Sequence, residues 1–283
     1  MPRKTLRFRD GFSTTTPWLR SEVRRLQWAL GEAGHQLKAD GFFGGGTEKA
    51  LKKFQEKNGL EGDGAANTET WALLEPLLEP LLSPRRTLWA NIMPAFRGDL
   101  DWIHDLEGHK GKAYWPKGKS GVTLDPGVDL GYVDQTLFRK LYEPILVGAQ
   151  LKAAEKVFGI TGEDARDALK ADPVLQGIRI GREQADEIMP FAAKPYWADI
   201  ANRFPALKRD EAFPAVQTVL LSLAYNRGPN NAGLEILSAP LEAGEWQEVS
   251  DLVGAMQQDH PQAGIRSRRQ WEANLIRSEL GLI

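Results

Sequence analysis

A single glycine-rich stretch, residues 112–132, interrupts an otherwise helical pattern in the larger, C-terminal part of the chain. Glycines at 118, 121, 127 and 131 separate short apolar runs there, which favours a small hairpin or sheet. Elsewhere apolar residues recur at helical intervals, which predicts helices over 99–107, 134–145, 148–158, 163–171, 182–190, 211–226, 245–257 and 266–280. We therefore predict an α+β protein, mainly α-helical, with one small β lobe.

The first 78 residues predict three short helices separated by two similar loops. The first helix starts at Thr16-Pro17 or Ser21, the second is capped by Thr47 and stopped at Gly59, and the third opens at Thr68. Their expected inward residues are Val23, Leu26, Leu30, Ala50, Leu51, Phe54, Trp71 and Leu74. One loop runs from Asp40-Gly41 to Thr47 and the other from Asp63-Gly64 to Thr70, which indicates an internal duplication.

Prolines at every fourth position, Pro76, Pro80 and Pro84, follow this region. Proline removes a backbone donor and disfavours helix at the residue before it, so a long regular helix is not expected. We predict a semi-rigid connector over residues 79–96, between an N-terminal domain, 1–78, and a larger domain, 97–283.

Composition excludes several function classes. The chain has 283 residues, enough for about two domains, and it has no cysteine, which rules out disulfides, thiolate metal sites and cysteine peptidases. Its four histidines form no His-Glu-x-x-His pair, so neither a zinc peptidase nor any other metal or cofactor is expected. The net charge of −2 gives no reason to expect nucleic-acid binding, and the apolar runs are too short for membrane insertion.

The N-terminal end shows no Sec-type signal peptide, because its charged residues flank no apolar core. Residues 1–25 are rich in arginine and lysine. Two interpretations stay open for them: a basic arm drawn to an anionic envelope surface, or a solvated and frayed terminus.

The N-terminal motifs resemble the peptidoglycan-binding domain 1 family. The matching residues are Leu26-Gln27, Asp40-Gly41, Gly44, Thr47, Ala50, Phe54-Gln55, Gly59-Leu60, Asp63-Gly64 and Thr70-Trp71. The resemblance implies a three-helix fold that docks on bacterial cell-wall glycopeptide. Candidate contacts are Phe42, Phe43, Lys49, Lys52 and Lys53, for which a buried core and a solvated face are the alternatives.

Glu107 is the first candidate for chemistry. It continues the apolar stripe of Leu100 and Ile103, and Gly108 ends the predicted helix directly after it. Desolvation and the negative end of the helix dipole both disfavour a charged carboxylate there, as a general acid requires. The alternative is a surface Glu107 paired with Lys110 or Lys112.

The β lobe supplies possible partners for Glu107. Thr123 and Asp125 share a strand face by alternation, and Asp129 follows a Pro-Gly turn that can bring it back toward them. Enzymatic hydrolysis of a glycosidic bond typically requires at least two carboxyl groups, one on each side of the bond. Asp125 has a strong alternative as a local turn cap.

These residues resemble the phage-type lysozymes, in particular their pesticin-like branch. The resemblance rests on Glu107-Gly108, Tyr114, Ser120-Gly121-Val122-Thr123-Leu124, Gly127, Asp129-Leu130-Gly131, Ser222 to Gly228, Gly264, Arg268-Arg269 and Glu272. It implies a lysozyme-like catalytic domain with a Glu–Asp–Thr triad, here Glu107, Asp129 and Thr123. The commoner position of the aspartate is occupied by Pro116, and Asp125 stands where glycine is usual, so Asp125 is a rival second carboxylate.

The resemblance also implies lesser roles for other residues. Tyr114, Tyr225 and Asn226 are expected to contact substrate, with core packing and helix termination as their alternatives. Arg268, Arg269 and Glu272 are expected to form a structural ion-pair network.

Together these features predict a modular phage endolysin with muramidase activity on the β-1,4 bond between N-acetylmuramic acid and N-acetylglucosamine. The alternatives are a lytic transglycosylase that needs Glu107 alone, a non-catalytic cell-wall-binding protein, and a bacteriocin. We expect a monomer whose partner is bacterial peptidoglycan. We also expect synthesis in the host cytoplasm, with a holin-type pore giving access to the periplasm and cell wall.

Overall fold

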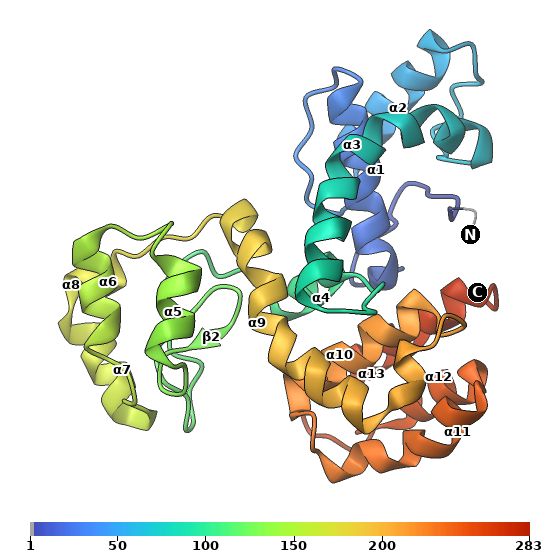
Figure 1. Cartoon of the computed structure of the whole chain (residues 1–283). Coiled ribbons are helices and arrows are strands. Elements are labelled where there is room, and N and C mark those ends of the chain that lie inside the picture. Colours follow the sequence, from blue (N-terminus) through green and yellow to red (C-terminus); the bar gives the residue numbers. More distant parts are fainter. Residues whose placement is uncertain (1–2) are drawn as a thin grey trace. The chain divides into compact units, whose positions relative to one another are not determined.

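Two units make up the structure, a computed structural model that describes residues 3–283. The first unit comprises Met1–Trp102 with Ala198–Ile283, and the second comprises Ile103–Trp197. One boundary falls within helix α4 (Leu100–Glu107) and the other within helix α9 (Arg182–Arg203) (Figure 1). The mainly helical fold with one small β lobe is confirmed, while the predicted domain boundaries stay a prediction.

The N-terminal part of the first unit contains three helices around one apolar core. They are α1 (Arg20–Glu32), α2 (Gly45–Lys57) and α3 (Thr68–Ile92), preceded by the 3-10 turn η1 (Pro17–Leu19). All eight residues expected to face inward are buried. The second helix begins after Gly44, so the prediction that Thr47 caps it is wrong. Thr47 instead lies buried inside the first turn, where its hydroxyl accepts a hydrogen bond from Gln27 Nε2.

Two buried glutamines organise the two Asp-Gly loops in the same way. Gln27 Nε2 donates to Asp40 Oδ1 and to Thr47 Oγ1, each at 3.1 Å, and Gln27 Oε1 accepts from Gly41 N–H at 2.8 Å. In the second copy, Gln55 Nε2 donates to Asp63 Oδ1 at 2.8 Å and to Thr70 Oγ1 at 3.1 Å, and Gln55 Oε1 accepts from Gly64 N–H at 2.9 Å. The matched contacts confirm the internal duplication.

Helix α3 continues through its prolines to Ile92, so the expectation that no long regular helix forms here is wrong. The semi-rigid connector over residues 79–96 stays a prediction. Pro76, Pro80 and Pro84 all lie on the exposed or partly exposed face, where the carbonyls they leave unpaired can meet water. Leu74, Leu78 and Leu82 fall at the same spacing on the other face and are buried. Burying one leucine stabilises by about 1.5–3 kcal/mol, which offsets an interior proline that costs about 3 kcal/mol.

The basic residues near the N-terminus are held by the fold. Leu6 is fully buried and its backbone pairs with that of Ala66. Arg3 contacts Glu22 and Glu75, each at 2.7 Å. The interpretation as a frayed terminus is therefore wrong from residue 3 onward, because carboxylates from α1 and α3 pair with Arg3. Met1 and Pro2 lie outside the described residues.

The rest of the first unit is a helical bundle around α10 (Pro214–Arg227). Every residue from Ala215 to Ala224 in this helix is buried, which confirms the predicted central helix. Around it lie η2 (Pro205–Lys208), η3 (Ala232–Leu237), α11 (Ser238–Ala243), α12 (Trp246–Ala255) and α13 (Ala263–Glu279).

A buried ionic network joins α10 to α13. Glu272 is fully buried and lies 3.2 Å from Arg268 Nε and 3.1 Å from Arg269 Nε, and its Oε1 accepts from Ser222 Oγ at 2.6 Å. The predicted structural network of Arg268, Arg269 and Glu272 is confirmed.

The second unit packs short helices against one hairpin. Strands β1 (Thr123–Leu124) and β2 (Val128–Asp129) are antiparallel, which confirms the predicted β lobe. The helices α5 (Gln135–Tyr142), α6 (Gly148–Glu155), α7 (Gly162–Ala171) and α8 (Pro173–Gln176) share an apolar core with it. Helix α9 runs past the predicted end at 190, through Pro190 and Pro195.

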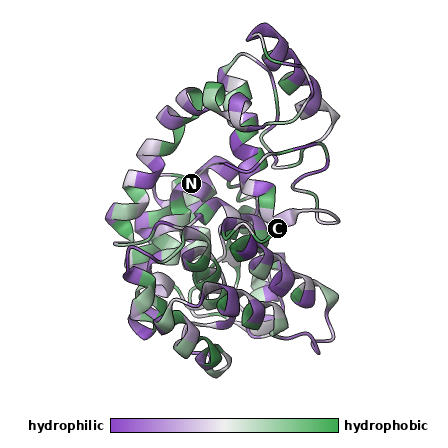
Figure 2. Ribbon diagram, turned by 90° about the vertical axis from the view of Figure 1, so that its right-hand side faces the viewer, coloured by the Kyte–Doolittle hydropathy of each residue, from purple (hydrophilic) through white to green (hydrophobic). Residues whose placement is uncertain are grey.

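Most helices alternate apolar and polar segments, as Figure 2 shows in green and purple. This is the amphipathic pattern of helices that cover a core. Within residues 3–283, none of the helices has the length and apolar character needed to span a bilayer.

Candidate active site

The hairpin places Thr123 directly opposite Asp129 in the β1–β2 ladder. Residues opposite each other in an antiparallel pair project from the same face, so the hydroxyl and the carboxylate lie side by side. Thr123 is buried and Asp129 is partly exposed. Two of the three predicted triad residues are therefore brought together by local backbone pairing.

Two glycine amides hold the Asp129 carboxylate. Gly121 N–H lies 2.9 Å from Asp129 Oδ1 and 3.1 Å from Oδ2, and Gly131 N–H donates to Oδ1 at 2.8 Å. A Cβ atom added at Gly121 would collide with Asp129 Oδ1 and with the backbone of Gly131. The glycines thus let the lobe close around a carboxylate whose orientation is set by backbone donors.

Glu107 is the last residue of α4, as predicted. Leu100 and Ile103 are buried on the same stripe, and Glu107 itself is partly buried. Gly108 follows in the left-handed region with φ +76°, and its N–H donates to His104 O at 3.0 Å. The chain therefore turns sharply away from the helix directly after the carboxyl-bearing residue.

Tyr114 pairs with the hairpin beside β1. Its backbone N–H donates to Thr123 O at 3.1 Å and its carbonyl accepts from Thr123 N–H at 2.8 Å, so it pairs beside β1. Burial raises the pKa of the Tyr114 phenol to about 12, and the charges of Asp125, Glu107 and Asp129 act in the same direction. The charges of all three candidate carboxylates therefore act on the predicted contact residue Tyr114.

Tyr196 of α9 is a second tyrosine on which the charges of Glu107 and Asp129 act, and no sequence pattern pointed to it. Burial is the main reason that the pKa of its phenol is raised, and the charges of Glu107 and Asp129 raise it further. Glu107 and Asp129 thus act on the same two phenols although they belong to different elements. No local motif marks Tyr196, because it lies on a helix whose predicted end was Pro190.

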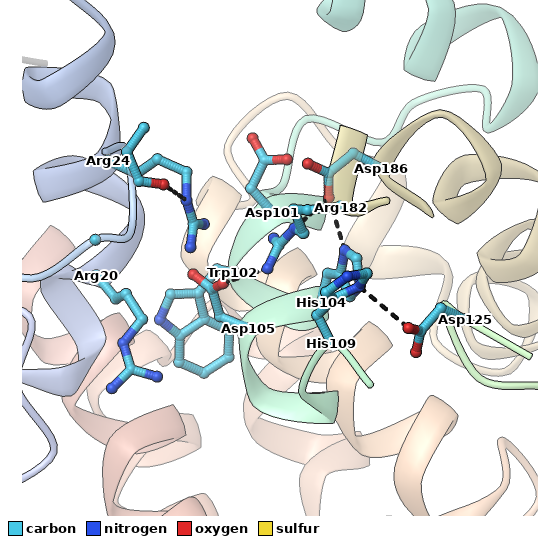
Figure 3. A network of polar contacts seen from close by, with 12 residues as sticks. Arg20, Arg24, Asp101, Trp102, His104, Asp105, His109, Asp125, Arg182 and Asp186 are labelled. Carbon is cyan, nitrogen blue, oxygen red and sulfur yellow. Dashed lines mark hydrogen bonds and ion pairs between the residues drawn. The ribbon is translucent and has the colours of Figure 1, made fainter. Parts of the chain in front are cut away.

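Asp125 has different surroundings from Asp129. It is 1% exposed, its Oδ1 accepts from Lys110 N–H at 3.2 Å, and its Oδ2 accepts from Gly111 N–H and lies 3.1 Å from His109 Nδ1. Its carboxylate is thus occupied by the segment that follows Glu107 (Figure 3).

A buried polar network supports α4 from the start of α9. His104 Nδ1 lies 2.6 Å from Asp186 Oδ1, and Arg182 contacts Asp186 at 2.8 Å and Asp105 at 2.9 Å (Figure 3). His104 is fully buried. Its spacing of four residues from Leu100 puts it on the buried stripe, a signal that the sequence analysis did not use.

Tyr225 and Asn226 belong to the first unit, at the end of α10. Asn226 Oδ1 accepts from Arg269 Nη2 at 3.3 Å, and Gly228 caps the helix with φ +85°. These contacts agree with a helix-ending role, and a substrate role for Tyr225 and Asn226 stays a prediction. Within residues 3–283, the structure has no group of three or more side chains suited to hold a metal ion.

The predicted contacts of the N-terminal domain fall into two groups. Phe43 is fully buried, so its core alternative holds. Phe42 is partly exposed, with the Arg20 guanidinium 4.6 Å from its ring centre and the Phe12 ring 5.1 Å away. Lys49 and Lys53 are exposed and Lys52 pairs with Glu48 at 3.0 Å, as expected of a solvated face.

Comparison with known proteins agrees with the N-terminal motifs. The chain matches no curated protein sequence. Among solved structures, the crystal structure of Burkholderia AP3 phage endolysin aligns with 95% of this chain and 98% of its own, at 20% identity and a TM-score of 0.22. Residues 20–74 match the family model of the peptidoglycan binding domain. Residues 20–74 are therefore similar to the peptidoglycan-binding domain family.

Proposed function

We propose that this protein is a modular peptidoglycan hydrolase of the endolysin type. It would cleave the β-1,4 bond between N-acetylmuramic acid and N-acetylglucosamine. The binding domain at 20–74 supports the wall as its target. The main support for this chemistry is the cross-strand pairing of Thr123 with Asp129, whose carboxylate accepts hydrogen bonds from two glycine amides. The charges of Asp129 and Glu107 both raise the pKa of Tyr114 and Tyr196.

Glu107 is the proposed general acid. It donates a proton to the glycosidic oxygen as the bond to the leaving sugar breaks. Its place at the end of a buried helical stripe gives it a partly desolvated setting, and residues 109–111, which follow the turn at Gly108, contact Asp125 of the lobe.

Asp129 is the proposed second carboxylate. It would orient a water on the opposite face of the sugar together with the Thr123 hydroxyl, or stabilise the oxocarbenium charge directly. Its partial exposure leaves the carboxylate accessible, and its backbone donors fix its orientation. Asp125 suits this role less well, because it is buried and its oxygens are occupied by residues 109–111.

The binding domain would hold the enzyme on the wall while the second unit cuts the glycan.

In the host, we propose synthesis in the cytoplasm, action as a monomer, and passage to the wall through a holin-type pore. Expression with and without a pore-forming protein tests this route: lysis should need the pore, and efficient export of this chain alone would contradict it.

The direct test identifies the ends released from purified peptidoglycan by the wild type, Glu107→Gln and Asp129→Asn. The wild type should release reducing muramic acid ends, and each variant should lose about 10²–10⁴-fold in rate. Asp172→Asn is the matched control, because Asp172 also accepts two backbone N–H groups in the second unit but caps α8.

Other outcomes separate the alternatives. Anhydro-muramic ends, with Asp129→Asn still active, would indicate a lytic transglycosylase that uses Glu107 alone. Wall binding without any released glycan, in the wild type and in both variants, would leave a cell-wall-binding protein.

A further inference from the structure

The three residues that start two positions after Glu107 all contact one carboxylate. His109 Nδ1 lies 3.1 Å from Asp125 Oδ2, Lys110 N–H donates to Oδ1 at 3.2 Å, and Gly111 N–H donates to Oδ2. Two backbone donors and the adjacent His109 ring, all on a carboxylate that is 1% exposed, form a built attachment rather than a surface contact. Asp125 therefore holds the segment that leaves the end of α4.

Asp125 is itself fixed on the hairpin that carries Asp129. It follows Leu124 at the end of β1, and Gly127 N–H donates to Leu124 O at 2.8 Å to close the turn. The Asp125 carbonyl accepts from the hydroxyl of the fully buried Tyr142 at 2.8 Å. The turn therefore has an anchor in the core of the second unit.

The other side of the attachment is equally supported. The ring of His109 meets that of His104 edge to face, with centroids 5.9 Å apart, and His104 is bonded to Asp186. Gly111 O accepts from Ile180 N–H at 3.2 Å. The segment after Glu107 is thus held on one side by Asp125 and on the other by the residues that lead into α9 (Figure 3).

We propose that Asp125 is a positioning residue, which fixes Glu107 relative to Asp129 by tying residues 109–111 to the hairpin. The proposal rests on the function proposed above. In glycoside hydrolysis the separation of the two carboxyl groups decides whether a water fits between them, so this attachment would set that separation. Asp125 would do so without touching the sugar.

Replacing Asp125 by asparagine should break the attachment and keep the size of the side chain. An amide has one acceptor oxygen, so its NH₂ group would face either Lys110 N–H or Gly111 N–H, donor against donor. A displacement of about 1 Å costs about 100-fold in rate, so Asp125→Asn should lower kcat on soluble glycan strands by about 100-fold. KM should stay unchanged, because Asp125 is not a substrate contact.

A spectroscopic measurement tests the attachment independently of activity. With selective ¹⁵N labelling, the Gly111 amide proton should move upfield in Asp125→Asn as its hydrogen bond to the carboxylate is lost. The imidazole of His109 gives a second signal. Burial lowers the pKa of His109, helped by His104 and Arg182 and opposed by Asp125 and Asp186, so losing the Asp125 charge should lower that pKa further.

Three variants complete the design. His109→Gln removes the imidazole contact with Asp125 and should lower kcat by about 10-fold with KM unchanged, which keeps the proposal testable should Asp125→Asn fold poorly. Asp172→Asn should leave kcat and the Gly111 signal at wild-type values. Asp129→Asn should lower turnover by about 10²–10⁴-fold without moving the Gly111 signal.

The outcomes distinguish the two proposals. A wild-type kcat in Asp125→Asn and in His109→Gln would overturn the positioning role and leave the proposed function intact. A loss in Asp125→Asn as complete as in Asp129→Asn, with the Gly111 amide unmoved, would also overturn it and make Asp125 the second carboxylate. Absence of glycan cleavage by the wild type would instead overturn the proposed function, and the positioning role with it.

Discussion

Thr123 and Asp129 are cross-strand partners in a ladder of only two residue pairs, and Tyr114 pairs with Thr123 on its other side. A hydroxyl, a carboxylate and a phenol thus come from three neighbouring backbone segments. Because this geometry depends on backbone pairing, a side chain can be exchanged here without moving its neighbours.

The first prediction concerns the hydroxyl of Thr123. Thr123→Val should lower kcat by about 100-fold, the cost of removing one well-placed hydrogen-bonding group from an active site. Thr123→Ser keeps the hydroxyl and should retain most activity. Initial rates on soluble glycan strands measure both variants, and a fully active Thr123→Val would remove Thr123 from the mechanism.

The second prediction concerns the space around Gly121, which has no room for a side chain. Its Cβ would lie 2.7 Å from Gly131 Cα and would also meet Asp129 Oδ1, so Gly121→Ala must displace the Asp129 carboxylate. The rate should fall by about 100-fold or more. In Gly148→Ala, the matched control, the new Cβ meets nothing within 4 Å, and the rate should not change. Equal activity of the two variants would contradict the role given to the glycine lobe.

The prolines of α3 allow a test of stability. Pro80 is exposed inside the helix, so Pro80→Ala restores a backbone donor and should raise the free energy of unfolding by about 1–3 kcal/mol. Pro214→Ala is the control, because Pro214 occupies the first turn of α10, where proline is favourable. Urea unfolding followed by circular dichroism measures both. An unchanged or lowered stability of Pro80→Ala would show that the helix depends on its prolines.

The raised pKa of Glu279 predicts that the stability of the fold depends on pH. Burial raises the pKa of its carboxyl, the nearby charge of Glu22 adds to this, and the hydrogen bond from Ala215 N–H opposes it. A raised pKa means that the folded state holds the proton more tightly than the unfolded state. The stabilisation is therefore present in acid and is lost as the pH rises through the folded pKa.

Glu279→Gln keeps an acceptor for Ala215 N–H and does not titrate. Its Tm should therefore exceed that of the wild type increasingly as the pH rises from about 4 to 7, around the ordinary range for glutamate. Glu211→Gln, at an exposed position, should show a constant difference. A Tm gain for Glu279→Gln that is largest in acid would contradict the sign of the shift.

Features that depend on neighbours in sequence were predictable. The stripe of Leu100, Ile103 and Glu107 follows from the helical period, and the return of Asp129 toward Thr123 follows from strand alternation and a short turn. The two Asp-Gly loops likewise repeat one local pattern around Gln27 and Gln55. In each case the interacting groups lie within a few residues, or repeat a motif, so local sterics determine the outcome.

Other features required the tertiary structure. Whether α3 continues through Pro80 depends on which face of it is buried, and no local rule for proline contains that information. Tyr196 belongs to α9 because this helix extends beyond Pro190, and His104 meets Asp186 across two elements far apart in the chain. The sequence by itself thus determined the mainly helical class, the binding motif and the acids available for chemistry. The tertiary structure decided the partners of each acid, because burial and long-range pairing, which separate Asp125 from Asp129, arise only when distant segments pack together.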